Sequence, residues 1–339
     1  MLRALGAVPV VLAVEDPAHG RDRWRLGDSE IRLAAARGPE PLAYAPGLRT
    51  LLAEARLDLL HLHGIWQYPS RAAGRWARDT GRPLVISPHG MLDRWITGRN
   101  AWKKHAARLL WERAAWHEAS AFHALTQAEA EDIAREVPGA RRVIVPNPAP
   151  RAGPERDRLP PPNLLYLGRI HPKKNLPALI AAWRSVRADL PEGASLTIAG
   201  WGDDAGIAML EAAMAPPDPS IQFVGTAFGA QKAALFDVAR FLVLPSVSEG
   251  LPMAILEAWA SGTPTLQSAA CNLPEGFEEG AALACGTDSA AIAHAIRAAL
   301  SVKEADWHRM SAAARELAAG PFSRSSIAQK WEAVYAAQL

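Results

Sequence analysis

The sequence is poor in cysteine, which excludes the small secreted proteins that depend on disulfides. Its 339 residues contain two cysteines, Cys271 and Cys285. Two such distant residues provide neither a disulfide framework nor the paired C-x-x-C spacing of a metal or redox site. We therefore expect a reducing, cytoplasmic environment.

Long apolar runs are also missing, so the sequence predicts no membrane-spanning helix. The segment 4–14 is similar to the apolar part of a secretory signal, but Pro9 interrupts it and Glu15 follows, so we interpret it as a buried strand. The net charge is only +2. Residues 1–150 contain 21 basic and 16 acidic side chains, and the remainder contain 16 and 19. The chain has a single basic cluster and a sequence pI of only about 8.6, which argues against nucleic acid as a partner.

What the sequence does contain is a repeated alternation of short apolar runs with longer helical patterns. The chain is long enough for two domains of common size. Apolar runs bounded by turn residues, alternating with Ala- and Leu-rich stretches, are typical of βα units around a parallel sheet. These runs are at 8–14, 57–64, 82–90, 120–126 and 141–147, and then at 163–169, 194–200, 221–225, 240–246 and 262–268. The sequence therefore predicts two doubly wound α/β domains.

A proline-rich segment separates the two sets of runs. Residues 147–162 read NPAPRAGPERDRLPPP and contain six prolines. We predict a first domain at 1–150, a linker at 151–162 and a second domain that begins at 163. If two open sheets face each other across a cleft, the carboxyl ends of their strands place ligands there.

The segment SVSEGLPMAILEAWASGTP, 246–264, holds two glutamates eight positions apart. Glu249 lies in a turn after an apolar run, and Glu257 lies within the helix that Pro252 introduces. The backbone N–H groups at the start of this helix, at 250, 251, 253 and 254, predict a site for a phosphate or a sugar oxygen. Glu249 is then suited to accept from sugar hydroxyls, and Glu257 from a ribose. A simpler role for such glutamates is to complement the helix dipole.

A second segment, LYLGRIHPKKNL at 165–176, places cations at a strand end. The predicted strand ends at Gly168, and Arg169 and Lys174 follow in the loop. Two fixed cations at the end of a parallel strand suit a diphosphate. The alternative is a solvated basic loop.

Together these segments resemble the retaining glycosyltransferases of the GT-B fold that carry the E-x-x-x-x-x-x-x-E motif. The resemblance rests on GRIHPKKN, IAGWGDD and the stretch from FVGTAFGAQK to LEAWASGTP in the second half. In the first half it rests on HLHGIWQYPS, SPHGMLDRW and HALTQAEAEDI. It covers nearly the whole chain and is strongest with the glycosyltransferase family 4-like bacterial enzymes that build surface or exopolysaccharides.

The resemblance implies roles for particular residues. Arg169 and Lys174 match the positions that bind the donor diphosphate, Glu249 the carboxylate that holds the transferred sugar, and Glu257 the one that holds the ribose. His89 matches a histidine that contacts the donor sugar near its anomeric carbon. The wider donor site matches Gly168, Thr226, Phe228, Gly250, Leu251 and Pro252, and the acceptor side matches His63, Gly64 and Gly90.

The resemblance also implies a reaction and its components. A hexose moves, with retention of configuration, from a UDP- or GDP-linked sugar to a glycan or a polyprenyl-diphosphate-linked acceptor. Positive groups stabilise the leaving phosphate, and a phosphate oxygen takes the acceptor proton. The sequence has no D-x-D motif, so we expect no metal and no other cofactor. The second domain would extend to 321, and the helix at 322–339 would pack back on the first domain.

Family members begin with a strand, a glycine-rich loop and a helix that lie ahead of the segment 2–16. We therefore expect the first domain to lack a central strand in this sequence, with the start of the protein lying upstream. The rival interpretations are a non-catalytic subunit that binds a nucleotide sugar, and a different enzyme on this architecture, such as a nucleotide-sugar epimerase or a sugar phosphorylase.

The segment 94–117 suggests contact with a membrane surface. It contains six basic residues and one acidic residue, and Trp95, Trp102, Leu109 and Trp116 recur every seven positions. On one helix this seam would lie beside Lys103, Lys104 and Arg108, as at the inner face of a cytoplasmic membrane. The alternative is that the tryptophans belong to the core.

Overall fold

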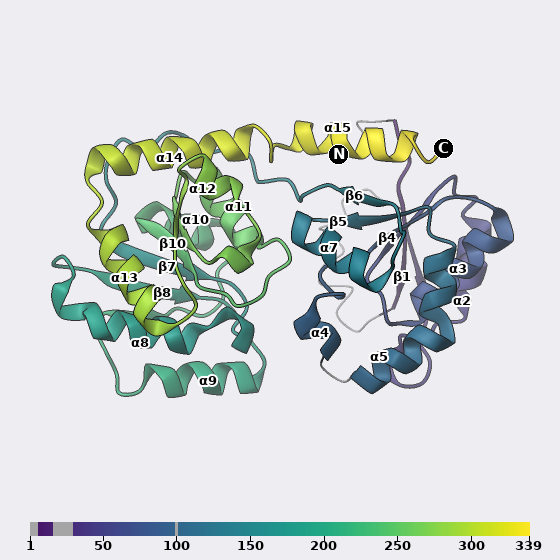
Figure 1. The fold of residues 1–339 in the computed structure, drawn as a ribbon, viewed down its shortest axis with the longest axis horizontal. Helices are drawn as coiled ribbons and strands as arrows, with labels where there is room; N and C mark the ends of the chain where they lie inside the picture. Colours follow the sequence, from purple (N-terminus) through teal and green to yellow (C-terminus); the bar gives the residue numbers. More distant parts are fainter. Residues whose placement is uncertain (1–5, 16–29, 99–100) are drawn as a thin grey trace. The chain divides into compact units, whose positions relative to one another are not determined.

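The computed structural model describes residues 6–15, 30–98 and 101–339, and it divides into two compact units (Figure 1). The first unit comprises Met1–Pro146 and Ala328–Leu339, and the second comprises Asn147–Ile327. Both are α/β, as the sequence predicts, and every strand pair in them is parallel. The second unit carries the larger sheet.

The six-stranded sheet of the second unit has the strand order β12-β11-β10-β7-β8-β9. The chain enters at the central strand β7, adds β8 and β9 on one side, and then adds β10, β11 and β12 on the other. The strands are β7 (Asn163–Leu167), β8 (Ser195–Ala199), β9 (Ile221–Phe223), β10 (Phe241–Leu244), β11 (Thr265–Gln267) and β12 (Ala282–Ala284). The order of strands therefore reverses between β7 and β10.

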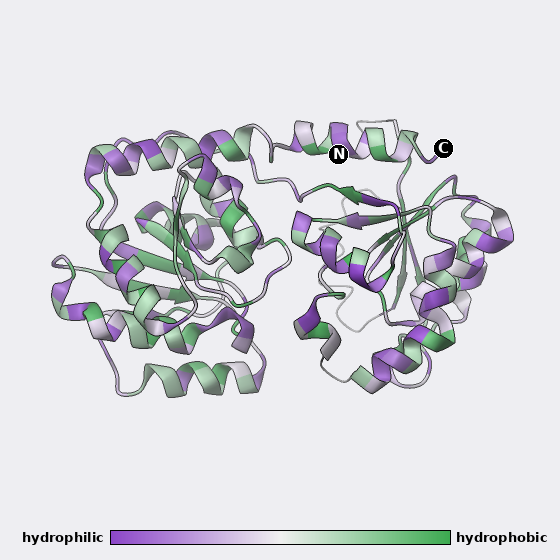
Figure 2. Ribbon diagram, in the orientation of Figure 1, coloured by the Kyte–Doolittle hydropathy of each residue, from purple (hydrophilic) through white to green (hydrophobic). Residues whose placement is uncertain are grey.

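The two central strands of this sheet are buried along their whole length. All residues of β7 and β10 are buried, and the strands are coloured as largely hydrophobic in Figure 2. Such continuous apolar strands are expected where helices cover both faces of a parallel sheet. The helices of this unit are α8 (Leu176–Val186), α9 (Asp204–Met214), α10 (Gly229–Val238), α11 (Met253–Ala260), α12 (Glu275–Glu278), α13 (Ser289–Leu300) and α14 (Glu304–Ala319), with short 3-10 turns η5 (Pro172–Lys174), η6 (Arg187–Asp189) and η7 (Ala269–Cys271).

Three fully buried tryptophans fill the core of the second unit: Trp183, Trp259 and Trp307. Each indole N–H has a partner. Trp183 Nε1 donates to Ser220 Oγ at 2.9 Å, and Trp307 Nε1 donates to the carbonyl of Arg240 at 2.8 Å. A buried indole is stable only when its polar edge is satisfied, so these bonds fix the orientation of the rings.

The proline-rich segment predicted as a linker is held against the second unit. The N–H of Gly153 donates to the carbonyl of Ala260 at 2.7 Å. The guanidinium of Arg156 donates to four acceptors, of which the nearest is the carbonyl of Phe236 at 2.5 Å. Burial lowers the pKa of Arg156. These residues therefore belong to the second unit and do not form a free linker between the two units.

The sheet of the first unit has the strand order β3-β4-β5-β6, and a separate two-stranded sheet joins β1 and β2. In the described part of the chain, no ladder connects the two sheets. The strands are β1 (Val10–Val14), β2 (Glu30–Ala34), β3 (Leu60–His63), β4 (Leu84–Ser87), β5 (Ala121–Ala124) and β6 (Arg142–Ile144). The sequence did not predict β2, because Glu30 and Arg32 interrupt its apolar pattern. In the structure the side chains of these two residues form an ion pair at 2.7 Å.

The helices of the first unit follow its strands. They are α2 (Gly47–Glu54), α3 (Tyr68–Thr80), α4 (Arg94–Gly98), α5 (Ala101–Ala107), α6 (Arg113–His117) and α7 (Gln127–Glu136), with the 3-10 turn η3 (Glu40–Leu42) and the π-helical turn η4 (Arg108–Glu112). The last helix, α15 (Arg324–Ala336), contributes its residues from 328 onward to this unit.

The predicted seam of residues at 95, 102, 109 and 116 is wrong as a single helical face. The side chain of Trp102 is 72% exposed, whereas that of Trp116 is 6% exposed and packs in the core. The cause is the π-helical turn η4, which adds a residue to the turn between them and rotates the later residues. The prediction for the side chain of Trp95 lies outside the described residues.

Candidate functional site

The carboxyl ends of β7 and β10 meet at the reversal point of the second sheet, where open α/β sheets bind their ligands. The loop after β7 carries Arg169 and Lys174, and the loop after β10 carries Glu249. The strand order thus brings together three residues that the sequence singled out. These loops form the candidate donor site of the second unit.

Lys174 and Glu249 form an ion pair across these two loops. Their side chains are only 11% and 6% exposed. Ser246, fully buried, also donates from its hydroxyl to Glu249 Oε1 at 2.6 Å. In the described part of the chain, the other carboxylate oxygen, Oε2, has no hydrogen-bond partner. Glu249 is therefore fixed in place through one oxygen and has the other available to accept from a hydroxyl group.

Two asparagines, both missed by the sequence reasoning, hold the backbone of these loops. Asn175 adopts a left-handed conformation, with φ of 62°. Its side-chain amide donates to the carbonyls of Pro245 at 3.2 Å and Thr287 at 2.7 Å. Asn272 donates to the carbonyl of Glu249 at 2.6 Å. Asparagine is a common residue in left-handed turns, so the sequence KKNL carried a signal for the first of these.

The start of α11 presents unpaired backbone donors. Helix α11 begins at Met253, with Pro252 at the capping position just before it. Among the described residues, none accepts from the N–H groups of Gly250, Leu251, Met253 or Ala254. A Cβ added at Gly250 would meet no atom within 4 Å, so there is open space above this turn. These donors can hold an anion or a sugar oxygen.

Arg169 lies over an aromatic ring at the edge of the same site. Its guanidinium carbon is 5.2 Å from the centre of the Trp201 ring, and Asp203 lies 3.7 Å from the same guanidinium. The backbone before it is tightly packed, because a Cβ at Gly200 would lie 1.8 Å from the carbonyl oxygen of Gly168. Only glycine fits there. Arg169 is 47% exposed and free to turn its planar group toward a phosphate.

Glu257 is also paired with a lysine. It lies on the second turn of α11, and Lys232 from α10 reaches its Oε1 at 2.8 Å. Sequence reasoning missed Lys232, because nothing in the stretch GAQKAAL indicates that this lysine pairs with Glu257. The loop before α10 carries the other predicted residues, Thr226 and Phe228, and both are exposed. The Phe228 ring lies at the surface and is 61% exposed.

The first unit places its predicted residues at the carboxyl edge of its own sheet. His63 ends β3, and His89 follows β4 with a left-handed φ of 54°. A hydrogen bond of 2.8 Å joins His63 Nδ1 to His89 Nε2, and the rings stack. Such backbone strain in a residue other than glycine is characteristic of functional sites. The structure thus brings the ends of these two strands, His63-Gly64 and His89-Gly90, together.

Two further histidines that the sequence did not mark lie beneath this pair. Ser87 Oγ joins His61 Nε2 and His123 Nδ1, each at 2.6 Å. The other nitrogen of His61 bonds the hydroxyl of Tyr335 at 2.7 Å. Burial is the main reason for low pKa values, about 2 for His61 and about 4 for His63 and His123, and the neighbouring histidines lower them further. Burial also lowers the pKa of His89. All four rings are thus neutral at pH 7.

Two buried glutamates support the loops that carry these histidines. Glu129, on the first turn of α7, accepts from the N–H groups of Gly90 at 2.6 Å and Leu125 at 2.8 Å. Glu112, in the π-helical turn, accepts from the N–H of Trp66 at 2.5 Å. The indole of Trp66 in turn donates to the carbonyl of Met91 at 3.3 Å. Burial raises the pKa of Glu112 to about 7.

The described residues contain no cluster of three or more His, Cys, Asp or Glu side chains that could hold a metal ion. The same part of the chain has no helix long and apolar enough to cross a bilayer.

Two family models together match most of the sequence. Residues 1–148 match the model described as "Glycosyl transferase 4-like domain", and residues 161–301 match "Glycosyl transferases group 1". The second match contains Arg169, Lys174, Glu249 and Glu257.

Characterised relatives and solved structures agree with these matches. A glycogen synthase of Mycobacterium tuberculosis is 27% identical over 97% of this chain and 80% of its own length. A GDP-mannose-dependent alpha-(1-6)-phosphatidylinositol dimannoside mannosyltransferase of the same species is 28% identical over 90% and 82%. The structure of Anabaena HepE in complex with UDP and glucose has a TM-score of 0.76 at 17% identity, covering 96% of this chain and 91% of HepE.

Proposed function

Because the chain belongs to the glycosyltransferases and has the GT-B fold, we propose that it transfers a hexose from a nucleoside diphosphate sugar with retention of configuration. The acceptor is a glycan or a lipid-linked oligosaccharide in surface or exopolysaccharide synthesis. The observation that carries this proposal is the Lys174–Glu249 pair, set beside the free N–H groups at the start of α11.

The chemistry of these groups matches the parts of the donor. Lys174, Arg169 and the free backbone donors suit the diphosphate, on which negative charge develops as the leaving group departs. Glu249 Oε2 suits a hydroxyl of the transferred sugar, and Glu257 suits the ribose. Phe228 offers a surface for the base. HepE has been crystallised with UDP and glucose, which supports a donor of the same class here.

The first unit is assigned to the acceptor side. His89 is the histidine we place next to the reacting sugar, and His63 holds it through the 2.8 Å bond. A neutral His89 can accept or donate a hydrogen bond without carrying a competing charge. The reaction is expected to proceed without a metal, since a helix N-terminus and two cations neutralise the phosphates. Loss of turnover in EDTA, restored by a divalent ion, would overturn that part.

The direct test is calorimetric titration of the full chain with UDP, GDP and ADP. We expect one of them to bind in the micromolar range. Arg169→Ala should weaken that binding about tenfold or more, because it removes a charge-assisted hydrogen bond to phosphate. Arg297→Ala is the matched control, since Arg297 is an exposed arginine of the same unit that pairs with Asp189. No binding of any nucleotide would favour the non-catalytic interpretation.

Peripheral contact with a membrane belongs to the same proposal. The π-helical turn interrupts the predicted seam. Among the described residues of the segment 94–117, the large apolar side chains that are exposed are Trp102, Leu109 and Leu110. Lys103 lies beside Trp102, with its Nζ 5.5 Å from the ring centre. Exposed tryptophan and leucine next to lysine suit the headgroup region of an anionic bilayer.

The membrane contact is tested by co-sedimentation with vesicles that contain an anionic phospholipid. Trp102→Ser combined with Leu109→Ser should reduce the bound fraction by about half or more. The matched pair Val238→Ser and Val247→Ser, also exposed apolar residues, should leave binding unchanged. Equal loss in both pairs would show a general effect of hydrophobicity and would refute a specific surface.

A further inference from the structure

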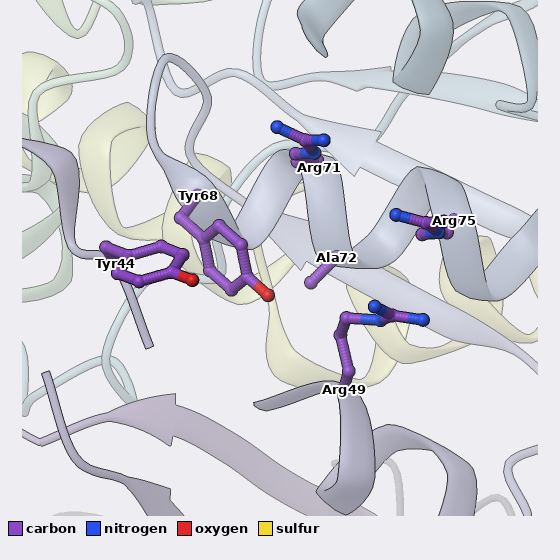
Figure 3. A pocket seen from close by; sticks show the side chains of 6 residues that line it. All are labelled: Tyr44, Arg49, Tyr68, Arg71, Ala72 and Arg75. Atoms are coloured by element: carbon purple, nitrogen blue, oxygen red, sulfur yellow. The ribbon is translucent and has the colours of Figure 1, made fainter. Parts of the chain in front are cut away.

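A hollow on the surface of the first unit is lined by three arginines and two tyrosines (Figure 3). Its floor is Ala72, which is almost fully buried and has a small side chain. The lining residues come from the loop after η3, from the first turn of α2 and from one face of α3. They are Tyr44, Arg49, Tyr68, Arg71, Ala72 and Arg75. We call this hollow the arginine pocket.

The arrangement on α3 follows helical spacing. Tyr68, Arg71, Ala72 and Arg75 lie three or four residues apart, so they share one face of the helix. Helices α2 and α3 are packed against each other, and Arg49 from α2 extends toward that face (Figure 3). The Tyr44 ring packs edge-on to the Tyr68 ring, with centroids 4.9 Å apart and an interplanar angle of 81°. The two rings form one wall of the pocket.

The charges in the arginine pocket are not balanced by acids. In the described part of the chain, Arg49, Arg71 and Arg75 have no ion pair and no side-chain hydrogen bond. Other arginines of this unit do have acidic neighbours. Arg32 pairs with Glu30, Arg78 with Asp79, Arg108 with Glu136 and Arg135 with Asp132. Gathering three like charges costs electrostatic energy, which a bound anion would offset.

The polar groups of the arginine pocket are almost all donors. Three guanidinium groups have no acceptor capacity, and the two tyrosine hydroxyls can also donate. In the described part of the chain, neither hydroxyl has a hydrogen-bond partner. A ligand that fits such a set has several acceptor oxygens and negative charge. Arginine forks match the oxygens of a phosphoryl group in geometry as well as in charge.

We propose that the arginine pocket binds a phosphoryl or diphosphoryl group carried by the acceptor. This inference rests on the proposed function, in that it names the chemistry of the acceptor. Tyr68 follows His63 by five residues, so the Cα atoms of these two residues lie at most about 17 Å apart. A phosphorylated acceptor held here is thereby anchored in the same unit as His63 and His89. The phosphoryl group belongs either to a lipid headgroup or to a free phosphorylated acceptor.

The test is calorimetric titration of the full chain with inorganic pyrophosphate. It is done in the Arg169→Ala background, so that the candidate donor site contributes little and a failure of the proposed donor site does not affect the result. We expect pyrophosphate to bind, and Arg75→Gln to weaken binding about tenfold or more through loss of a charge-assisted contact. Arg78→Gln, on the same helix but outside the pocket, removes the same charge and should leave binding unchanged.

A second arm identifies the source of the phosphoryl group. Co-sedimentation is measured with vesicles of phosphatidylglycerol and of phosphatidylcholine. A lipid headgroup is indicated if the chain binds the anionic vesicles, if pyrophosphate competes with that binding, and if Arg75→Gln weakens it more than Arg78→Gln does. Pyrophosphate binding without vesicle binding indicates a free phosphorylated acceptor. Absence of pyrophosphate binding, or an equal loss in Arg75→Gln and Arg78→Gln, would overturn the proposal.

Discussion

In the second unit the candidate site is held by side chains of opposite charge, Lys174 with Glu249 and Lys232 with Glu257. In the first unit the corresponding edge of the sheet is lined by four histidines that are neutral and joined through a serine, a tyrosine and each other. The two sites therefore respond to different changes in their surroundings. Removal of a charge should affect the second unit most, and a change of pH should affect the first.

The largest effect is expected from the Lys174–Glu249 pair. Glu249→Gln or Lys174→Met alone should lower kcat by about 10²–10³, the usual cost of removing a group that stabilises the transition state. Each single change also leaves a buried charge without its partner, which destabilises the fold by about 3–5 kcal/mol. Steady-state kinetics combined with thermal unfolding measures both effects.

The double variant Lys174→Met/Glu249→Gln separates catalysis from stability. It removes both charges, so its thermal unfolding should return close to that of the unmodified chain, while its turnover stays low. If the double variant recovered activity as well as stability, the pair would have only a structural role.

Acid should weaken the first unit through its histidines. His123 has a pKa of about 4 in the folded chain and about 6.5 when unfolded. The unfolded chain therefore binds protons more readily, and the free energy of unfolding falls as the pH decreases from 6.5 to 4, by about 3 kcal/mol for this residue. Hydrogen exchange of the β4 and β5 amides at pH 7 and pH 4.5 measures this loss. Because the intrinsic exchange rate itself falls in acid, the comparison uses protection factors, and protection factors that are equal at both pH values would contradict the prediction.

Glu112 should give the opposite dependence in the same unit. Its carboxyl has a pKa of about 7 when folded, against 4.5 when unfolded, so the folded chain holds its proton more tightly. The free energy of unfolding should then fall as the pH rises from 4.5 to 7, by about 3 kcal/mol. Glu112→Gln keeps an acceptor for the N–H of Trp66 and removes the titration. We expect urea unfolding of this variant to match that of the unmodified chain at pH 5 and to show greater stability at pH 8.

The smallest effect is expected for the partly exposed Lys232–Glu257 pair. Such pairs contribute about 0–1 kcal/mol. Lys232→Met should change the midpoint of thermal unfolding little and should leave nucleotide affinity within about fivefold, since Glu257 itself remains. A loss as large as that of Arg169→Ala would show that Lys232 binds the donor directly.

The sequence was informative about the ends of strands and uninformative about which strands are neighbours. Arg169 and Glu249 could be assigned to a site because each follows an apolar run that a glycine or proline ends. The bond between Lys174 and Glu249 could not be predicted, since these residues are 75 positions apart and only the order of the sheet brings them together. The same reason explains why Lys232 was missed.

The sequence also did not predict which side chains of the segment 94–117 share one helical face. A seven-residue repeat predicts one face only if the helix stays regular, and the π-helical turn at Arg108–Glu112 breaks that condition. Tertiary packing selects this turn, because it brings the Glu112 carboxyl to the N–H of Trp66. Spacing in sequence could identify the apolar residues of this segment but not which of them are buried.

Asn175 has a further consequence for how this site can diversify. Among the described residues, its amide donates only to main-chain carbonyls, those of Pro245 and Thr287, so the loops it joins are held in a way that does not depend on their side chains. Apart from Ser246 and Glu249, side chains in the loops after β10 and β12 can thus change with the ligand while the backbone arrangement persists. Asn175 itself cannot change to aspartate in the same way, because a carboxylate oxygen would then face the carbonyl oxygens of Pro245 and Thr287, and all of these atoms are acceptors.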